Sequence, residues 1–372
     1  MGRDNTLPQA LFRPLDKLRE LFLSGNGLRT VRIEIGGTEI KLANDQGLIS
    51  LAGPILDRLD LSRNRLCPSR KNSNDTFGIE WPPARQLSLE NANVLELNST
   101  HWTFGEVKVE QQQKLANNSI ARLPPELFEQ YTQLNSLDLS QNAFYHFHFG
   151  DSSHQQQTTL IFLNLSQNRL RSVSLPTLSS LTLLDLSYNI LTEFASLSSL
   201  PSLEHLHLSG NAGIRLTIAA EHPALLRLHL ANCSLTKMPD LSRLIALREL
   251  DLRTNGLESV PGHLLPSRGV NALDVEGNAL RELGWDWRAE QLAALRDLRA
   301  VGNPWECACE FAPPVVQQLF TPQTQQTTVR AATEGKAGLI KGHFSVGGNV
   351  HAETNTEKLR MSTEKQQNSS KT

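Results

Sequence analysis

Cysteine is scarce in this chain of 372 residues, which contains four cysteines, and methionine and tyrosine occur three times each. No two cysteines are spaced as CxxC, so the chain lacks the redox motif and the zinc-ligand pairs that use this spacing. So few cysteines also exclude a fold that depends on a dense set of disulfides. The fold must therefore be held together mainly by buried apolar side chains.

An excess of one charge and long apolar runs are absent as well. The 36 Lys and Arg residues are balanced by 38 Asp and Glu residues, which leaves a formal net charge of −2. This balance provides no basic field for nucleic acid and no polybasic patch for a membrane surface. No stretch approaches the roughly 18 consecutive apolar residues of a membrane-spanning helix. The opening residues, MGRDNTLPQALFRPL, do not resemble a secretory signal peptide. We expect no nucleic-acid partner and no membrane span in this chain.

Catalytic and cofactor motifs are also missing. The sequence contains no GxxxxGKS/T phosphate loop, no HExxH zinc motif and no GxSxG nucleophile turn. A metal site at Cys307 and Cys309 is disfavoured because the sequence offers no further ligands beside them. We predict no enzymatic activity, no cofactor and no metal.

Leucine is abundant and recurs in a frame that reads LxxLxLxxNxL. The first clear copy is formed by Leu18, Leu21, Leu23, Asn26 and Leu28. Nine further copies begin at Leu56, Leu134, Leu160, Leu181, Leu203, Leu225, Leu247, Val270 and Leu295, and from Leu134 on their first positions are about 21 to 26 residues apart. Degraded copies bring the expected number to about thirteen coils, and they lie near Ile40 and Leu42, at Ala84, Leu87 and Leu89, and at Leu115, Asn118 and Ile120.

The frame predicts a short strand whose two leucines point inward while the residues between them point outward. One such coil cannot bury its own leucines. Stacked coils pair their strands in parallel and merge the leucines into one core, which removes apolar surface from water at about 25 cal/mol per Å².

The asparagine of the frame has a separate role. Backbone N–H and C=O groups turn inward where the chain leaves the strand, and an Asn side chain offers both a donor and an acceptor to them. We expect a structural column at Asn64, Asn142, Asn168, Asn189, Asn211, Cys233, Asn255 and Asn278. Cys233 fits this column as a small buried thiol, and a reactive thiol is the less favoured alternative.

Over roughly residues 7 to 311 this pattern resembles the leucine-rich repeat superfamily. The resemblance implies an α/β repeat solenoid, a horseshoe with a concave parallel β-sheet and an irregular or short helical convex side. It implies little about function, because the superfamily includes receptors, matrix proteins, immune factors and intracellular regulators.

After the last coil the chain reads VGNPWECACEF. This segment is similar to the start of the cysteine-rich C-terminal cap of extracellular leucine-rich repeat proteins, such as Toll-type receptors, Slit-type guidance proteins and insect leucine-rich immune proteins. The resemblance implies that Trp305 covers the open end of the core and that Cys307 and Cys309 each pair with a later cysteine. No cysteine follows them and Cys67 lies many coils away, so these disulfides cannot close within this chain.

We predict three parts: a solenoid over 1–303 without an N-terminal cap, a truncated cap over 304–320, and a tail over 321–372. The tail is rich in Gln, Thr, Ser, Lys and Gly, which predicts disorder. Solenoids need shielded ends, so the abnormal ends indicate an internal portion, or an incomplete gene model, of a longer secreted or membrane-anchored protein.

Asn-x-Ser/Thr sequons suit a secreted glycoprotein. Asn74, Asn98 and Asn117 are the candidates for glycosylation, whereas Asn164 and Asn232 fall within or beside predicted strands and Asn368 lies in the tail.

The concave sheet is the expected contact surface for a protein partner or another ligand. Two groups of residues distinguish the concave face from a surface that only contacts solvent. Phe162 and Leu183 are apolar residues predicted to be exposed on neighbouring strands, with Tyr188 near the same edge. Beside them lies a charged group made of His205, His207, Arg227 and His229, flanked by Asp185 and Asp251. Histidines titrate near neutral pH, so the contact is expected to depend on pH, the alternative being surface histidines without a role.

Three functions remain open. The first is a secreted, extracellular recognition module, with an innate immune or receptor-like role suggested by the resemblance alone. The second is an intracellular adaptor or phosphatase regulator in the cytoplasm, which the missing signal peptide and the few cysteines favour. The third is a truncated product without function.

Overall fold

The structure is a computed structural model that describes residues 9–15, 17–28, 32–35, 38–41, 56–66, 79–80, 84–94, 97–98, 111–123, 134–148, 159–283, 286–305, 328–332 and 341–344. Cys67, Asn74, Cys307, Cys309 and Asn368 lie outside the described residues.

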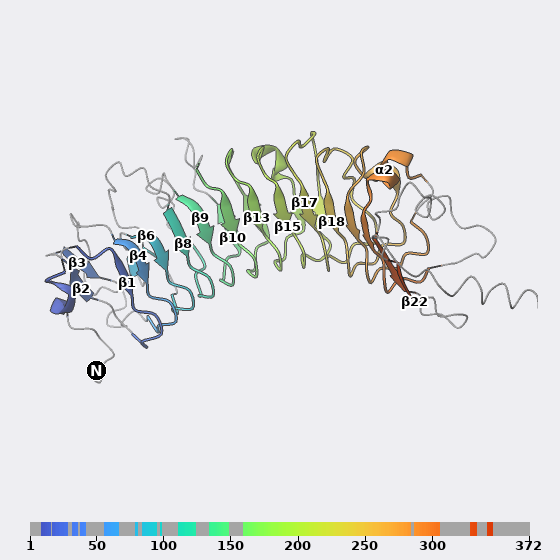
Figure 1. Ribbon diagram of the computed structural model, residues 1–372. Helices are drawn as coiled ribbons and strands as arrows, with labels where there is room; N and C mark the ends of the chain where they lie inside the picture. The colour runs from blue at the N-terminus through green and yellow to red at the C-terminus, as the bar shows by residue number, and fades with distance from the viewer. Residues whose placement is uncertain are drawn as a thin grey trace, which may run out of the picture.

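A fourteen-stranded sheet runs through the molecule, and its strands lie side by side in chain order along a gently curved array (Figure 1). The strands that form its parallel part are β1 (Glu20–Phe22), β4 (Leu56–Asp60), β6 (Ala84–Ser88), β8 (Gln111–Lys114), β9 (Leu134–Asp138), β11 (Phe162–Asn164), β13 (Leu183–Asp185), β15 (His205–His207), β17 (Arg227–His229), β18 (Glu249–Asp251), β19 (Ala272–Asp274) and β20 (Asp297–Arg299). This arrangement is the predicted horseshoe.

The core lies directly beneath the sheet. In the middle strands the central leucine is buried and both flanking residues are partly exposed. Leu137, Leu163, Leu184 and Leu206 are neighbours in register and have no exposed surface. The prediction that leucines of successive coils share one interior is confirmed.

The return segments are irregular, with short 3-10 and α-helical turns and pairs of short strands. The helical turns are η1 (Gln9–Phe12), η2 (Ser196–Ser199), η3 (Gly262–Leu264) and α2 (Ala289–Ala294). The parallel strand pairs are β10 (His146–His148) with β12 (Ser172–Ser174), β14 (Glu193–Phe194) with β16 (Arg215–Leu216), and β5 (Ile79–Glu80) with β7 (Leu97–Asn98).

One expected coil is wrong. The degraded copy near Ile40 and Leu42 lies where β2 (Arg32–Ile35) and β3 (Thr38–Lys41) pair antiparallel with each other, and the main sheet passes directly from β1 to β4. The first two clear copies of the frame begin at Leu18 and Leu56, and the chain between them is longer than one coil requires. The surplus chain forms a local hairpin, whose hydrogen bonds need no neighbouring coil.

The tail is not wholly without regular structure. Its strand β21 (Thr328–Ala332) pairs in parallel with β20, and β22 (Lys341–Phe344) pairs antiparallel with β21. The prediction of disorder fails over these two ranges. The physical reason is that β20 would otherwise present an unpaired row of backbone N–H and C=O groups, which an added strand satisfies.

The asparagines form a hydrogen-bonded column across the coils. Asn64 is typical: its amide donates to the carbonyls of Leu61 and Leu23 at 2.8 Å each, and its Oδ1 accepts the backbone N–H groups of Asn26 and Leu28. Each asparagine therefore joins its own coil to the preceding one, and equivalent bonds are made by Asn118, Asn142, Asn168, Asn189, Asn211, Asn255, Asn278 and Asn303.

Cys233 occupies this column as a fully buried residue, with Sγ 3.4 Å from the Leu208 carbonyl. A thiol offers no equivalent of Oδ1, and the preceding coil is adapted to this. It contains one extra residue, Gly213, whose backbone N–H donates to the Cys233 carbonyl at 2.7 Å. Gly213 has φ 72°, which glycine adopts at little cost. Burial raises the pKa of the Cys233 thiol, as expected of an unreactive cysteine.

A second column precedes the asparagines. In most coils the residue just before the asparagine position has a left-handed backbone conformation. Its N–H donates to a backbone carbonyl of the next coil, as the N–H of Tyr188 does to the carbonyl of Ser209. The non-glycine members have φ between 52° and 56° and are Arg63, Asn91, Asn117, Gln141, Gln167, Tyr188, Asn232 and Thr254. We call this column the turn edge; it lies beyond the C-terminal ends of the strands.

Candidate functional site

The outward residues of neighbouring strands stand in register and form continuous rows on the concave face. One row carries Asp185, His207, His229 and Asp251 on successive strands. The adjacent row carries Leu183, His205, Arg227 and Glu249 at the matching positions. The structure therefore brings together the outward side chains expected from the repeat frame.

The aspartates of the first row have two tasks. The Oδ1 atom of Asp185 accepts the backbone N–H of Ser187, and that of Asp251 accepts the N–H of Arg253. These bonds close the turn that follows each strand. Only the second oxygen of each carboxylate remains to face the neighbouring strands.

Those second oxygens meet the histidines. Asp185 Oδ2 lies 3.6 Å from His207 Nδ1, and Asp251 Oδ2 lies 3.7 Å from His229 Nδ1 and 3.3 Å from Arg253 Nε. The two imidazole rings are themselves in contact, with centroids 4.4 Å apart. We call His205, His207, Arg227 and His229 the histidine strip.

Two histidines of the strip favour the neutral imidazole. Burial lowers the pKa of His229 below its ordinary value, and His207 lowers it further against the opposing effect of Asp251. Burial and the charge of Arg227 lower the pKa of His205. Burial alone would raise the pKa of Asp185, but its contacts with His207 and Ser187 bring that pKa below the ordinary value. His205 and His229 therefore gain charge only on acidification.

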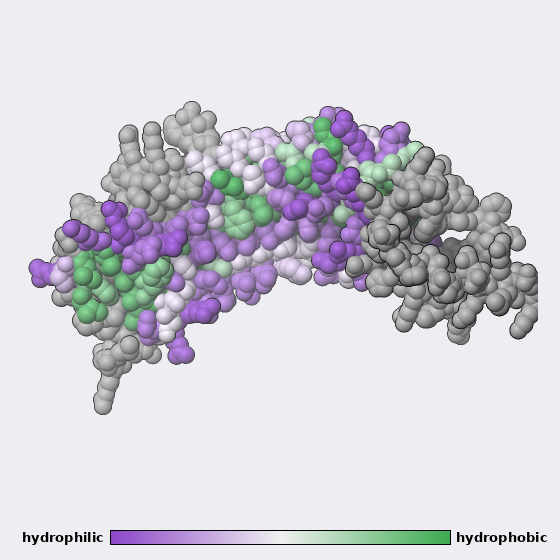
Figure 2. Space-filling view, viewed as in Figure 1, coloured by the Kyte–Doolittle hydropathy of each residue, from purple (hydrophilic) through white to green (hydrophobic). Residues whose placement is uncertain are grey.

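An apolar patch adjoins the strip. Phe162 and Leu183 are half-buried and pair in register on β11 and β13, and Ile161, just before β11, is 44% exposed. In the space-filling view an apolar area interrupts the hydrophilic surface over the middle of the array (Figure 2). We call Ile161, Phe162 and Leu183 the apolar patch.

Tyr188 is separate from this patch. It lies on the turn edge, beyond the end of β13 that is opposite to Leu183, and is 57% exposed. Its ring packs over Gly210, where an added Cβ would lie 2.6 Å from Tyr188 Cδ1. The hypothesis of one compact hot spot with Phe162, Leu183 and Tyr188 is therefore reduced to the two strand residues.

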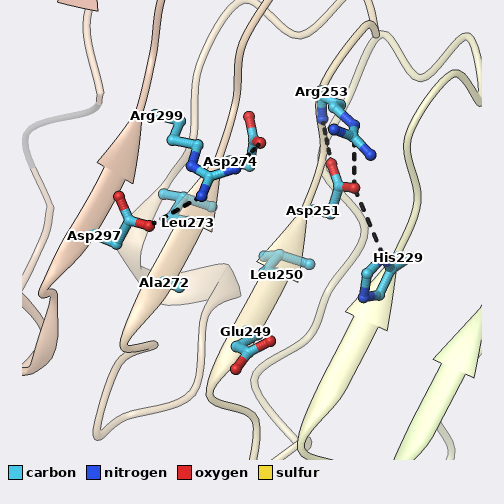
Figure 3. Close-up of a pocket in the computed structure, with 10 residues that line it drawn as sticks. All are labelled: His229, Glu249, Leu250, Asp251, Arg253, Ala272, Leu273, Asp274, Asp297 and Arg299. Atoms are coloured by element: carbon cyan, nitrogen blue, oxygen red, sulfur yellow. Dashed lines mark hydrogen bonds and ion pairs between the residues drawn. The ribbon is translucent and has the colours of Figure 1, made fainter. Parts of the chain in front are cut away.

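A hollow of about 380 Å³ continues the face beyond the strip, over β17 to β20. Figure 3 shows that charged side chains line it in alternation: Arg253 and His229 both approach Asp251, and Arg299 lies between Asp274 and Asp297. Burial and the neighbouring Asp251 raise the pKa of Asp274. Among the residues that the structure describes, no group of three or more His, Cys, Asp or Glu side chains is arranged to hold a metal.

The remaining predicted residues are Trp305 and the sequon asparagines. Trp305 is partly buried and packs against the core, with its Nε1 donating to the Ala300 carbonyl at 2.8 Å. Of the glycosylation candidates, Asn117 is exposed on the turn edge, as is Asn232, and Asn98 ends β7. Asn164 uses its Oδ1 to accept the N–H of Ser166.

Sequence reasoning did not select Ile161, Glu249 and Arg253 as site residues. Arg227 Nε lies 2.8 Å from a Glu249 oxygen, and Arg253 shares Asp251 with His229. The repeat frame does indicate Glu249, because it places this residue in the same outward row as His205 and Arg227. Ile161 and Arg253 lie outside the strand rows, so the repeat frame gave no signal for them.

Within the described part of the chain, no helix is long and apolar enough to cross a membrane. No protein-family model and no curated protein matches the sequence.

Solved structures resemble the chain in fold. The TLR13 chain of a complex with the RNA ssRNA13 is 22% identical, with a TM-score of 0.65 over 89% of this chain and 47% of that one. A chain of the LRIM1/APL1C complex is 20% identical, with a TM-score of 0.60 over 86% of this chain and 58% of that one. The Drosophila Toll–Spatzle complex matches at 20% identity and a TM-score of 0.53, over 88% of this chain and 38% of that one.

The chain thus spans about half the length of the first solved structures that it matches, with 47% and 58% of those chains covered. Identities near 20% indicate shared architecture rather than shared ligands. With the register of its strands, its leucine core and its asparagine column, the chain has the leucine-rich repeat fold.

Proposed function

We propose that the chain is an extracellular recognition module that binds a protein partner on its concave face, over β11 to β18. The observation that carries the proposal is the position of the apolar patch beside the histidine strip on one continuous row of strands. An aromatic and aliphatic anchor with an arginine nearby matches the composition of interface centres, which are enriched in aromatic residues and Arg.

Two further observations support the extracellular setting. The segment from Asn303 to Cys309 resembles the start of an extracellular cap, and the sequon residue Asn117 is exposed on the turn edge. The Toll–Spatzle complex is described as a molecular hub in Drosophila development and innate immunity. An innate immune role for this chain is proposed on that likeness.

The test is a binding screen of the purified chain against secreted proteins and receptor ectodomains, followed by affinity measurements in solution with each partner found. Ile161→Asp places a charge in the apolar patch and is expected to weaken binding about tenfold or more, because interface anchors carry about 2 kcal/mol or more each.

The matched control is Ile245→Asp. Ile161 and Ile245 are both 44% exposed, but Ile245 lies in the return segment between β17 and β18. Equal loss of binding in both variants, or no loss in either, contradicts the proposed site. Expression through a eukaryotic secretory route tests the extracellular location. Absence of a glycan on Asn117 would contradict an extracellular protein and favour the cytoplasmic alternative.

A further inference from the structure

We propose that the histidine strip reverses the net charge of the binding face on acidification, so that the face then binds an acidic segment of its protein partner. This inference rests on the proposed function of the concave face. It adds the chemistry of the partner and the condition under which binding occurs.

The charges that face the strip come from every strand packed against it. They are Asp185 on β13, Glu204 next to β15, Glu249 and Asp251 on β18, and Arg253 in the turn after β18. Together with Arg227, this gives four carboxylates and two guanidinium groups while the imidazoles are neutral. These six groups then have a net charge of minus two, and protonation of His205, His207 and His229 among them changes the sum to plus one.

The carboxylates already present do not fully neutralise the added charge. Asp185 and Asp251 each have one oxygen bound to a backbone N–H of the turn, and the other oxygen of Asp251 is shared between His229 and Arg253. Glu249 lies 2.8 Å from Arg227. Protonated rings at the 4.4 Å separation of His207 and His229 would repel each other.

An external anion relieves that repulsion. A carboxylate of a bound partner placed over the two rings contacts both, so partner binding and proton uptake favour each other. Burial is the main cause of the lowered pKa values of His205 and His229, and the neighbouring Arg227 and His207 lower them further. Binding is therefore weakest while the rings are neutral and increases as they gain charge.

The apolar patch favours a protein segment over a nucleic acid. Leu183 lies on β13, next to the strip, and Phe162 lies on β11, one strand further, with Ile161 just before it. These residues offer contacts for an apolar side chain of the same segment. Few arginines lie beside the strip, and nucleic-acid affinity depends on many phosphate contacts. The ligand is therefore an acidic peptide segment with an apolar residue beside its carboxylates.

The experiment measures the fluorescence anisotropy of a labelled, glutamate-rich synthetic peptide that contains one phenylalanine, titrated with the full chain between about pH 7.5 and about pH 5.5. Affinity is expected to rise about tenfold or more towards the acidic end. In the triple variant His205→Gln, His207→Gln, His229→Gln the affinity is expected to be the same at both ends. The control His148→Gln changes an exposed histidine on β10, away from the strip, and should keep the full response.

Three outcomes overturn the inference: an affinity that does not change with pH, a triple variant that keeps the response, and acid-dependent binding of polyuridylate in place of the peptide. The proposed function is tested separately. If a partner found in the ectodomain screen binds equally across the pH range but is lost in Ile161→Asp, the concave face stands as the binding site and only the charge reversal is refuted.

Discussion

At the scale of single residues, the asparagine column connects the coils most directly. Each member donates to carbonyls of two coils and accepts a backbone N–H of the preceding one, so a single side chain satisfies groups that would otherwise be buried without partners. Cys233 shows how the column tolerates an exception. The thiol cannot accept the N–H of the preceding coil, and the extra residue Gly213 redirects that N–H to the Cys233 carbonyl.

Asn189→Ala tests this role in the centre of the array. Asn189 is 5% exposed, and its loss leaves the N–H of Leu170 without its acceptor. The carbonyls of Leu165 and Leu186 each lose one of two asparagine donors, since Asn168 and Asn211 still donate to them. We expect the free energy of unfolding to fall by on the order of 3 kcal/mol, measured by urea denaturation. Asn189→Cys retains a weak donor, as at Cys233, and should lose less. If both variants were as stable as the parent, the column would not contribute to stability.

At the scale of one strand, β8 departs from the frame. Gln113 has no exposed surface and stands in the leucine row, in register with Leu87 and Leu137. Burial of an amide among leucines costs free energy even when part of its hydrogen bonding is satisfied. The strand β8 thus keeps its place in the sheet although the leucine of this position is missing.

Gln113→Leu is expected to raise the free energy of unfolding by about 1 kcal/mol, because it exchanges a buried amide for the leucine of the repeat. The adjacent Gln112 faces outward on the same strand, so Gln112→Leu provides the matched control and should leave stability nearly unchanged. Urea midpoints measure both variants. A lower midpoint for Gln113→Leu would mean that the bonds of its amide outweigh the burial of leucine.

At the scale of the whole molecule, curvature and register turn separate coils into one surface. The apolar patch, the histidine strip and the charged hollow over β17 to β20 follow one another along the sheet from β11 to β20. They do so because each successive coil places its two outward residues one strand further along. A ligand that spans several coils meets all three in that order.

The stability of the molecule should depend on pH through the same histidines. His205 and His229 have lower pKa values in the folded chain than in the unfolded chain, so the unfolded chain binds more protons between the two values. The contribution of these histidines to the free energy of unfolding is thus expected to be fully present above about pH 6.5 and to be lost as pH falls below that value. Thermal unfolding at several pH values measures this.

The double variant His205→Gln, His229→Gln should show a shallower decrease than the parent over that window, and His148→Gln should follow the parent curve. A double variant with an unchanged slope would assign the acid sensitivity to other groups. Asp274 acts in the opposite direction, because its pKa is raised in the folded chain and its contribution to stability therefore increases as pH falls.

The sequence alone determined the leucine interior, the rows of outward residues and the place of Cys233 in the asparagine column, because each depends on a local spacing that recurs in every coil. Only the tertiary structure decided the rest. The contact of His207 with His229, the ion pairs of the second oxygens of Asp185 and Asp251, and the separation of Tyr188 from Leu183 depend on how neighbouring coils and turns meet. The hairpin of β2 and β3 and the added strands β21 and β22 arise where the repeat stops, and there backbone hydrogen bonding, rather than leucine spacing, fixes the path of the chain.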